Sequence, residues 1–315
     1  MALTPAPFLS EIAFGAEGGA ALWVKSSDDI RIRIGHWKPD NAKGTVLIFP
    51  GRTEFIEKYN QTAGAFAKRG LASMAIDWRG QGLADRLIDN RDLGHVEHFT
   101  DYQKDVDRMV RAARDLGMPR PFFLLGHSMG GAIGLRAAME GLPVQALAFT
   151  GPMWGIRLAP HLRPMAWFLS HLMPMIGQGH RLPPGTKMEH HILTEGFEDN
   201  LLTKDRAQFE QMRVQLERHP ELALGGPSYV WLREALLETR HLAHRAAPNL
   251  PCITFLGTNE RIVDIPVIHR RMEAWNRGHL ELVENGEHEV LMESEAVSAP
   301  IFDQMTALFL SGGHG

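Results

Sequence analysis

Short apolar runs alternate with amphipathic segments along most of the chain. The first run, IRIRIGHW, alternates strictly between apolar and polar positions, whereas several later runs, such as TVLIF, FFLL and CITFL, are nearly unbroken apolar stretches. Continuous apolar runs of this kind are typical of strands buried on both faces of a sheet. The predicted strands are 30–37, 45–51, 71–77, 122–126, 144–150, 252–257 and 279–285.

Segments with helical periodicity separate these strands. The predicted helices are 54–69, 100–116, 129–140, 265–277 and 294–311. Strands that interleave with helices predict an α/β fold, with a mostly parallel central sheet and helices on both faces. In such sheets ligands bind beyond the carboxyl ends of the strands.

Residues 152–227 interrupt the alternation. They are rich in proline, methionine, tryptophan and histidine, and no clear strand pattern occurs among them. We therefore expect an α/β core made of 1–151 and 228–315, with 152–227 as a helical lid inserted between two strands.

One stretch of this insertion has an apolar helical face that we expect to contact an acyl chain. Its members lie at positions i, i+3, i+4 and i+7, with a tryptophan shortly before them: Met165, Phe168, Leu169, Leu172 and Trp154. Flexible methionines suit a surface that repacks around different ligands. The alternative is that the same face only seals the insertion onto the core.

The motif Gly126-His127-Ser128-Met129-Gly130 lies between a predicted buried strand and a predicted helix. A serine at such a corner has a strained backbone, and glycines around it avoid clashes with the neighbouring strand and helix. The corner raises the hydroxyl above the sheet and directs the N–H of Met129 toward a bound oxyanion. Ser128 is therefore the candidate nucleophile.

A serine hydroxyl needs a general base, and the base needs an acid to orient it. In this context the order along the chain is serine, acid, histidine. His288 lies in a glycine-containing loop after the last predicted strand and is the candidate base. Glu260, three residues after Gly257, is the favoured acid; Asp264 is the alternative, although it also suits the cap of the helix beginning near 265.

The second oxyanion donor is expected from the loop after an early strand. Gly51 permits a tight turn there, and the N–H of Arg52 is the candidate donor. The Arg52 side chain has two open interpretations, a contact with a phosphate or a structural salt bridge to Glu54 or Asp77. Gly51 and His127, which adjoin the two donors, are expected to line the substrate site.

Together these motifs resemble α/β-hydrolases of the monoacylglycerol lipase and bacterial lysophospholipase group, also known as serine aminopeptidase-like hydrolases. The resemblance rests on GHSMGG, DWRGQGLADR (77–86), GTNERIVD and NGEHEVLME. Members of the group usually have a His-Gly pair before the oxyanion loop, whereas this chain has Pro50-Gly51-Arg52. The Pro50-Gly51-Arg52 sequence at this place, and a glutamate as the acid, resemble the bacterial lysophospholipase branch more than the eukaryotic monoacylglycerol lipases. The resemblance implies an α/β-hydrolase fold.

Composition limits the alternatives. A net charge of -4 argues against a dedicated nucleic-acid binder, and the one cysteine, Cys252, is compatible with a reducing compartment. The N-terminal stretch lacks the pattern of a secretory signal, and no apolar run reaches the ~20 residues of a membrane span. We expect a cytoplasmic protein. An alternative that the sequence does not decide is peripheral contact of the lid with the inner membrane.

Three histidine pairs occur without a third ligand at a recognisable spacing, so neither a metal nor a cofactor is expected: His95/His98, His190/His191 and His241/His244.

The predicted activity is hydrolysis of the carboxylic ester of a single-acyl-chain lipid, a lysophospholipid or a monoacylglycerol, through an acyl-enzyme. The alternatives are a serine aminopeptidase, a short-chain carboxylesterase, a transacylase and a non-catalytic lipid-binding protein of the same fold. An aminopeptidase would need a carboxylate cluster under the lid, for which the insertion offers Glu189, Glu195, Glu198 and Asp199.

Overall fold

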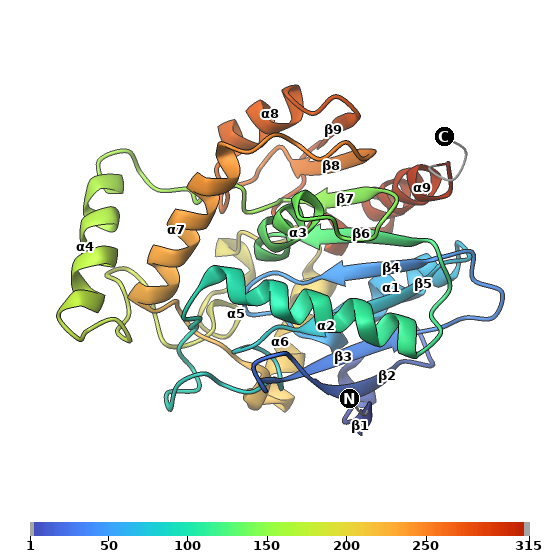
Figure 1. Ribbon diagram of the computed structural model, residues 1–315, viewed down its shortest axis with the longest axis horizontal. Coiled ribbons are helices and arrows are strands. Elements are labelled where there is room, and N and C mark those ends of the chain that lie inside the picture. The colour runs from blue at the N-terminus through green and yellow to red at the C-terminus, as the bar shows by residue number, and fades with distance from the viewer. Residues whose placement is uncertain (1–2, 312–315) are drawn as a thin grey trace.

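The computed structural model describes residues 3–311, and in this part of the chain nine strands form one sheet (Figure 1). The spatial order is β1-β2-β3-β5-β4-β6-β7-β8-β9. β1, β2, β3 and β5 pair antiparallel in succession, and all pairs from β5 through β4 to β9 are parallel. The strands are β1 (Thr4–Ala6), β2 (Ala20–Lys25), β3 (Arg31–Trp37), β4 (Thr45–Phe49), β5 (Ala72–Asp77), β6 (Phe122–His127), β7 (Leu147–Thr150), β8 (Cys252–Gly257) and β9 (Gly278–Val283).

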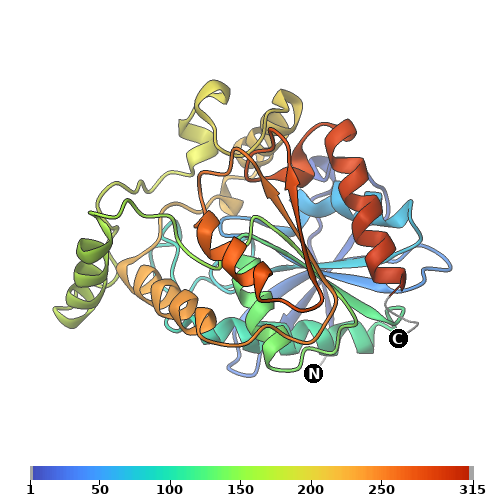
Figure 2. The same cartoon turned by 90° about the horizontal axis from the view of Figure 1, so that it is seen from above.

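Helices cover both faces of the sheet, as predicted. α1 (Asn60–Ala67) and α9 (Glu295–Ser311) pack on one face, and α2 (Tyr102–Asp115), α3 (Met129–Met139) and α8 (Ile265–Glu273) pack on the other. Figure 2 shows α9 on the side of the sheet opposite α2 and α3. In β4, Val46 and Ile48 belong to one hydrophobic core, and Leu47 and Phe49 to the other. Burial on both faces explains why the strand reads as a continuous apolar run.

Some element boundaries differ from the sequence prediction. The segment predicted as one helix, 54–69, begins with a short 3-10 turn, Ile56–Tyr59, before α1. The strand predicted at 144–150 begins only at Leu147 because the preceding residues still form the turn after α3. β1, β2 and helix α7 (Tyr229–Ala243) were not predicted.

Residues 152–227, called the insertion here, contribute no strand to the sheet, and all of them are described. They contain the helices α4 (Arg163–Met175), α5 (His191–Thr194) and α6 (Arg206–Arg218). α4 packs against α7 at a distance from the sheet (Figure 1). Ile192, Met212 and Leu216 of α5 and α6 form a separate small core with Phe55, which follows β4. The insertion therefore packs on the core through both α4 and the pair α5 and α6.

Candidate active site

Ser128 lies between β6 and α3 with φ 50° and ψ -118°, a strained conformation for a residue with a side chain. Its N–H donates to the Thr150 carbonyl at 3.1 Å, and its carbonyl accepts from the N–H groups of Gly131 (2.9 Å) and Met153 (2.8 Å). These bonds fix the corner to the neighbouring strand and to the first turn of α3. Strain maintained in this way is typical of functional sites.

The glycines around Ser128 are required by close backbone approach. A Cβ on Gly130 would lie 1.9 Å from the Phe49 carbonyl oxygen, and one on Gly126 would lie 3.0 Å from the Gly130 carbonyl oxygen. β6 and α3 can therefore meet at this angle, against β4, only with glycine at both positions.

His288 follows β9 in a loop and is buried, and its Nδ1 lies 2.6 Å from Oε2 of Glu260. Glu260, after β8, also accepts at Oε1 from the N–H groups of Ile262 (2.6 Å) and Val263 (3.2 Å). Burial would raise the pKa of Glu260, but the hydrogen bond and charge of His288 and these two N–H groups lower it below its ordinary value. Glu260 is thus held as a carboxylate that accepts from the Nδ1 of His288.

Asp264, the alternative acid, is engaged elsewhere. Its carboxylate accepts from the Arg163 guanidinium of α4 at 2.6 Å. It stands at the N-cap position of α8, but its side chain caps no backbone N–H. The geometry therefore associates Glu260, and not Asp264, with His288.

Gly151, directly after β7, was not singled out by the sequence. It has φ +46°, and a Cβ there would lie 2.9 Å from Nδ1 of His288 and 3.2 Å from Oε2 of Glu260. The missing side chain provides the space in which these two groups meet.

The two predicted oxyanion donors are both without an acceptor in the described part of the chain. No hydrogen bond from the N–H of Met129 or of Arg52 to a described residue is found. Gly51 lies against the serine, since a Cβ on it would be 3.1 Å from the Ser128 Cβ. The role of both N–H groups as oxyanion donors stays a prediction, and neither N–H group is engaged by a described residue.

The loop that carries Arg52 is fixed by polar side chains that the sequence did not reveal. Glu54 accepts from the Gly51 N–H, and Gln81 contacts the Thr53 N–H and the Gly51 carbonyl, both at 3.2 Å. Thr53 adopts φ 70°, which is unusual for a threonine. The hydrogen bonds of Glu54 and Gln81 hold this loop in place and so maintain the strained backbone of Thr53.

A buried charged network lies beside the nucleophile. The Lys58 ammonium bonds the carboxylates of Glu54 and Glu289, and the Nε2 of His127 lies 3.3 Å from Glu289. Burial would lower the pKa of His127, but Glu289 and Glu54 raise it above its ordinary value. The His127 ring also packs 4.8 Å from the His288 ring, centroid to centroid. Through the His127 ring, the charged network therefore packs against His288, the candidate base.

A cavity of about 450 Å³ opens at Ser128 and His288, and its lining is mostly apolar. Gly51, His127, Met165 and Leu169 line it, in agreement with the sequence prediction. Apolar residues that were not predicted complete the wall: Ile156, Leu158, Leu162, Met212, Leu216, Trp231 and Ile262. The volume is in the range of small-molecule sites.

Three of the predicted lining residues lie elsewhere. Trp154 is buried in the core, where it packs on Phe149 and donates to the Gly131 carbonyl at 3.1 Å. Phe168 is 60% exposed, and Leu172 is half-buried away from the cavity. Met165, Phe168, Leu169 and Leu172 all lie on α4, as predicted, but only Met165 and Leu169 line the cavity.

The Arg52 side chain forms neither of the salt bridges considered from the sequence. Glu54 binds Lys58, and Asp77 binds Arg33 at 2.7 Å. Arg52 lies in the cavity wall, donates to the Gly225 carbonyl at 2.6 Å and has its guanidinium 5.7 Å from the centroid of the Trp231 ring.

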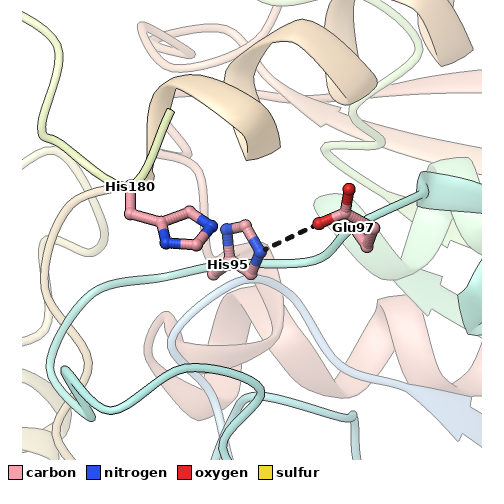
Figure 3. A group of neighbouring side chains, drawn as sticks. All are labelled: His95, Glu97 and His180. Carbon is pink, nitrogen blue, oxygen red and sulfur yellow. Dashed lines mark ion pairs between the residues drawn. The ribbon is translucent and has the colours of Figure 1, made fainter. Parts of the chain in front are cut away.

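His95, one of the histidines paired in the sequence, contacts a histidine from a distant part of the chain. His95 meets His180 of the insertion, with ring centroids 4.7 Å apart, and its Nε2 lies 3.6 Å from Glu97 (Figure 3). In that view the His95 ring lies between the other two side chains, and its Nδ1 bonds Ser228 at 2.9 Å. The contacts link the insertion to the core. The absence of a metal stays a prediction.

Comparison with known proteins agrees with this arrangement. Residues 40–295 match the family described as "Serine aminopeptidase, S33". The chain belongs to this family. The resemblance stated from the motifs is thereby confirmed.

Among relatives, lysophospholipase L2 of Escherichia coli (strain K12) is 29% identical over 283 residues, covering 86% of this chain and 81% of that protein. A monoacylglycerol lipase of Mycolicibacterium smegmatis is 30% identical over 174 residues, covering 53% of this chain and 56% of that protein. A crystal structure of a soluble variant of monoglyceride lipase from Saccharomyces cerevisiae superposes with a TM-score of 0.70 at 19% identity, covering 92% of this chain and 94% of that one. The fold is therefore that of the α/β-hydrolases, as predicted.

Proposed function

We propose that the protein is a serine hydrolase that cleaves the carboxylic ester of a lipid with a single acyl chain. The observation that carries the proposal is the joint opening of Ser128 and His288 onto one mostly apolar cavity, with His288 bound to Glu260. The names of the relatives, lysophospholipase L2 and monoacylglycerol lipase, support the same class of substrate.

In the proposed reaction Ser128 attacks the ester carbonyl while Nε2 of His288 accepts the hydroxyl proton. The Glu260 carboxylate stabilises the imidazolium. The N–H groups of Met129 and Arg52 bind the oxyanion, and the alcohol leaves with the proton from His288. Water then attacks the acyl-enzyme with His288 again as base, and the fatty acid is released. No cofactor takes part.

The cavity argues for a lipid ester over an amino-terminal peptide substrate. An aminopeptidase would need a free carboxylate to bind the substrate ammonium. The insertion's candidates do not line the cavity: Glu189, Glu195, Glu198 and Asp199. The two carboxylates that do line it, Glu54 and Glu289, both bind Lys58.

We further propose that the insertion acts as a lid and that α4 contacts a membrane surface. No helix among residues 3–311 is both long and apolar enough to cross a membrane. The proposal is supported by large apolar side chains at 50–82% exposure on and next to α4: Leu162, Met165, Phe168, Met175 and Ile176.

A flotation assay with phospholipid vesicles tests the membrane contact of α4. Phe168→Ser combined with Met175→Ser should reduce binding, whereas Leu237→Ser, at an exposed leucine of α7, should not. Equal binding by both variants would refute the contact.

The catalytic proposal is tested by fatty-acid release from lysophosphatidylcholine, a monoacylglycerol, p-nitrophenyl butyrate and an aminoacyl-amide, with wild type and Ser128→Ala. We expect serine-dependent release from the first two, faster than from the short ester. Activity on butyrate or the amide alone would contradict the lipid assignment.

A further inference from the structure

Arg52 lines the cavity and, unlike three arginines of the core, has no carboxylate partner among the described residues. Arg33, Arg79 and Arg136 each bind two carboxylates. No carboxylate of the described residues lies within ion-pair distance of the Arg52 guanidinium, and its hydrogen bond to the Gly225 carbonyl occupies one of its five N–H donors. Removal from water lowers the pKa of Arg52 to about 10, which still leaves it a cation at neutral pH. A cation that is partly removed from water and has no counter-ion is costly unless a ligand supplies the opposite charge.

No charged group of the cavity forms an ion pair with Arg52 among the described residues. Lys58 lines the same cavity, but it is neutralised by Glu54 and Glu289. These two carboxylates are in turn occupied, so neither is available to Arg52. The cavity wall therefore presents one cation whose partner is not a described residue of the chain.

A second polar group of the cavity lies close to Arg52. His191 stacks on His190 with ring centroids 4.6 Å apart, and no described residue forms a hydrogen bond with its ring. Burial, and after it the charges of Arg52 and Lys58, lower the pKa of His191 to about 4, so the ring is neutral and carries one N–H donor. Arg52, which uses one of its five N–H donors on Gly225, and His191 thus both bring to this cavity N–H groups for which no described acceptor is found.

We propose that Arg52, assisted by His191, binds the phosphate of the substrate's head group, which makes the substrate a lysophospholipid rather than a neutral monoacylglycerol. This inference rests on the proposed ester hydrolysis. A guanidinium offers paired N–H donors that match phosphate oxygens. Arg52 directly follows Gly51, which adjoins the Ser128 Cβ. One residue would then place its N–H on the ester oxyanion and its side chain on the phosphate of the leaving alcohol.

The test compares two soluble substrates with the same acyl chain, 1-oleoylglycerol and 1-oleoylglycerol 3-phosphate, below their aggregation concentrations. The quantity measured is the ratio of kcat/KM for the phosphate-bearing substrate to that for the neutral one. Arg52→Met should lower this ratio by ~10- to 100-fold, the usual cost of losing a charge-assisted bond. Arg52→Lys should restore part of it. The matched control is Arg233→Met on α7, an arginine that binds Glu234 at 3.1 Å and does not line the cavity.

A measurement on the wild type covers the case in which Arg52→Met fails to fold. Glycerol 3-phosphate should inhibit hydrolysis of 1-oleoylglycerol more strongly than glycerol or inorganic phosphate does at equal concentration. Equal inhibition by inorganic phosphate would overturn the head-group assignment and indicate a site for free phosphate.

The two levels of the proposal fail in different ways. If the wild type hydrolyses neither substrate, the proposed ester hydrolysis is wrong. If it hydrolyses both with dependence on Ser128, and the ratio is the same in Arg52→Met as in Arg233→Met, only the assignment of the phosphate to Arg52 is overturned.

Discussion

The substitution Glu260→Gln tests the link between Glu260 and His288 without changing the volume of the side chain. Oε1 of Glu260 accepts two backbone N–H groups, from Ile262 at 2.6 Å and Val263 at 3.2 Å. In the variant the amide oxygen must occupy this position, because an amide NH₂ there would face two donors. The NH₂ group is then directed at Nδ1 of His288, where the carboxylate oxygen now lies at 2.6 Å. The Nδ1 must become an acceptor, so the ring proton moves to Nε2, and Nε2 can no longer accept the proton of Ser128.

Two effects lower kcat in this variant. The His288 ring has the wrong tautomer, and the negative charge that stabilises its imidazolium is missing. In a serine protease the equivalent exchange lowers kcat by about ten-thousand-fold. We expect a thousand- to ten-thousand-fold loss of kcat here, which corresponds to roughly 4 to 5.5 kcal/mol of transition-state free energy. KM should change little because Glu260 does not line the cavity that opens at Ser128 and His288.

The assay is steady-state hydrolysis of a soluble single-chain ester, with the melting temperature measured in parallel. Asp264→Asn is the control, since its carboxylate binds Arg163 at 2.6 Å. It should retain kcat within a few-fold. A folded Glu260→Gln variant with nearly full kcat, or a large loss in Asp264→Asn alone, would refute the assignment of the acid.

Three further outcomes follow from the buried charges and the glycines. Lys58→Met removes the cation between two buried carboxylates and should lower the free energy of unfolding by roughly 3–5 kcal/mol, measured by urea denaturation; an unchanged midpoint would contradict the network. Gly151→Ala should reduce kcat ~100-fold because its Cβ would lie 2.9 Å from Nδ1 of His288, whereas Gly141→Ala, also at positive φ but with nothing within 4 Å, should affect stability alone. The pKa of Glu260 is lower in the folded protein than the ordinary 4.5, so its contribution to stability is complete above that pH and disappears as the pH falls through the folded value. Melting temperatures of wild type should therefore decline more steeply on acidification than those of Glu260→Gln, and parallel curves would count against the shift.

The parts of the site that follow strand ends were predictable from the sequence. Ser128, Glu260 and His288 each come shortly after a strand of the parallel part of the sheet, and parallel strands bring their carboxyl ends to one edge. The preference for Glu260 over Asp264 also agrees with the geometry, because the former lies nearer to its strand.

The supporting contacts were not predictable, because they join distant segments. The bond between Lys58 and Glu289 spans 231 residues of sequence, and no motif in the sequence pairs the two residues. Periodicity identified the apolar face of α4 but could not indicate which part of it meets the cavity. Phe168 therefore proved to be exposed, whereas Met165 and Leu169 line the wall.

The most direct test of the account is to identify the residue that carries the acyl group during turnover. A single-chain lipid ester would be mixed with the enzyme, quenched with acid within the first turnovers, and the peptides analysed by mass spectrometry. We expect the mass of the fatty acyl group on the peptide that contains Ser128, and no acyl peptide and no turnover in Ser128→Ala. An acyl group on another residue, or hydrolysis that persists in Ser128→Ala, would contradict the proposed mechanism.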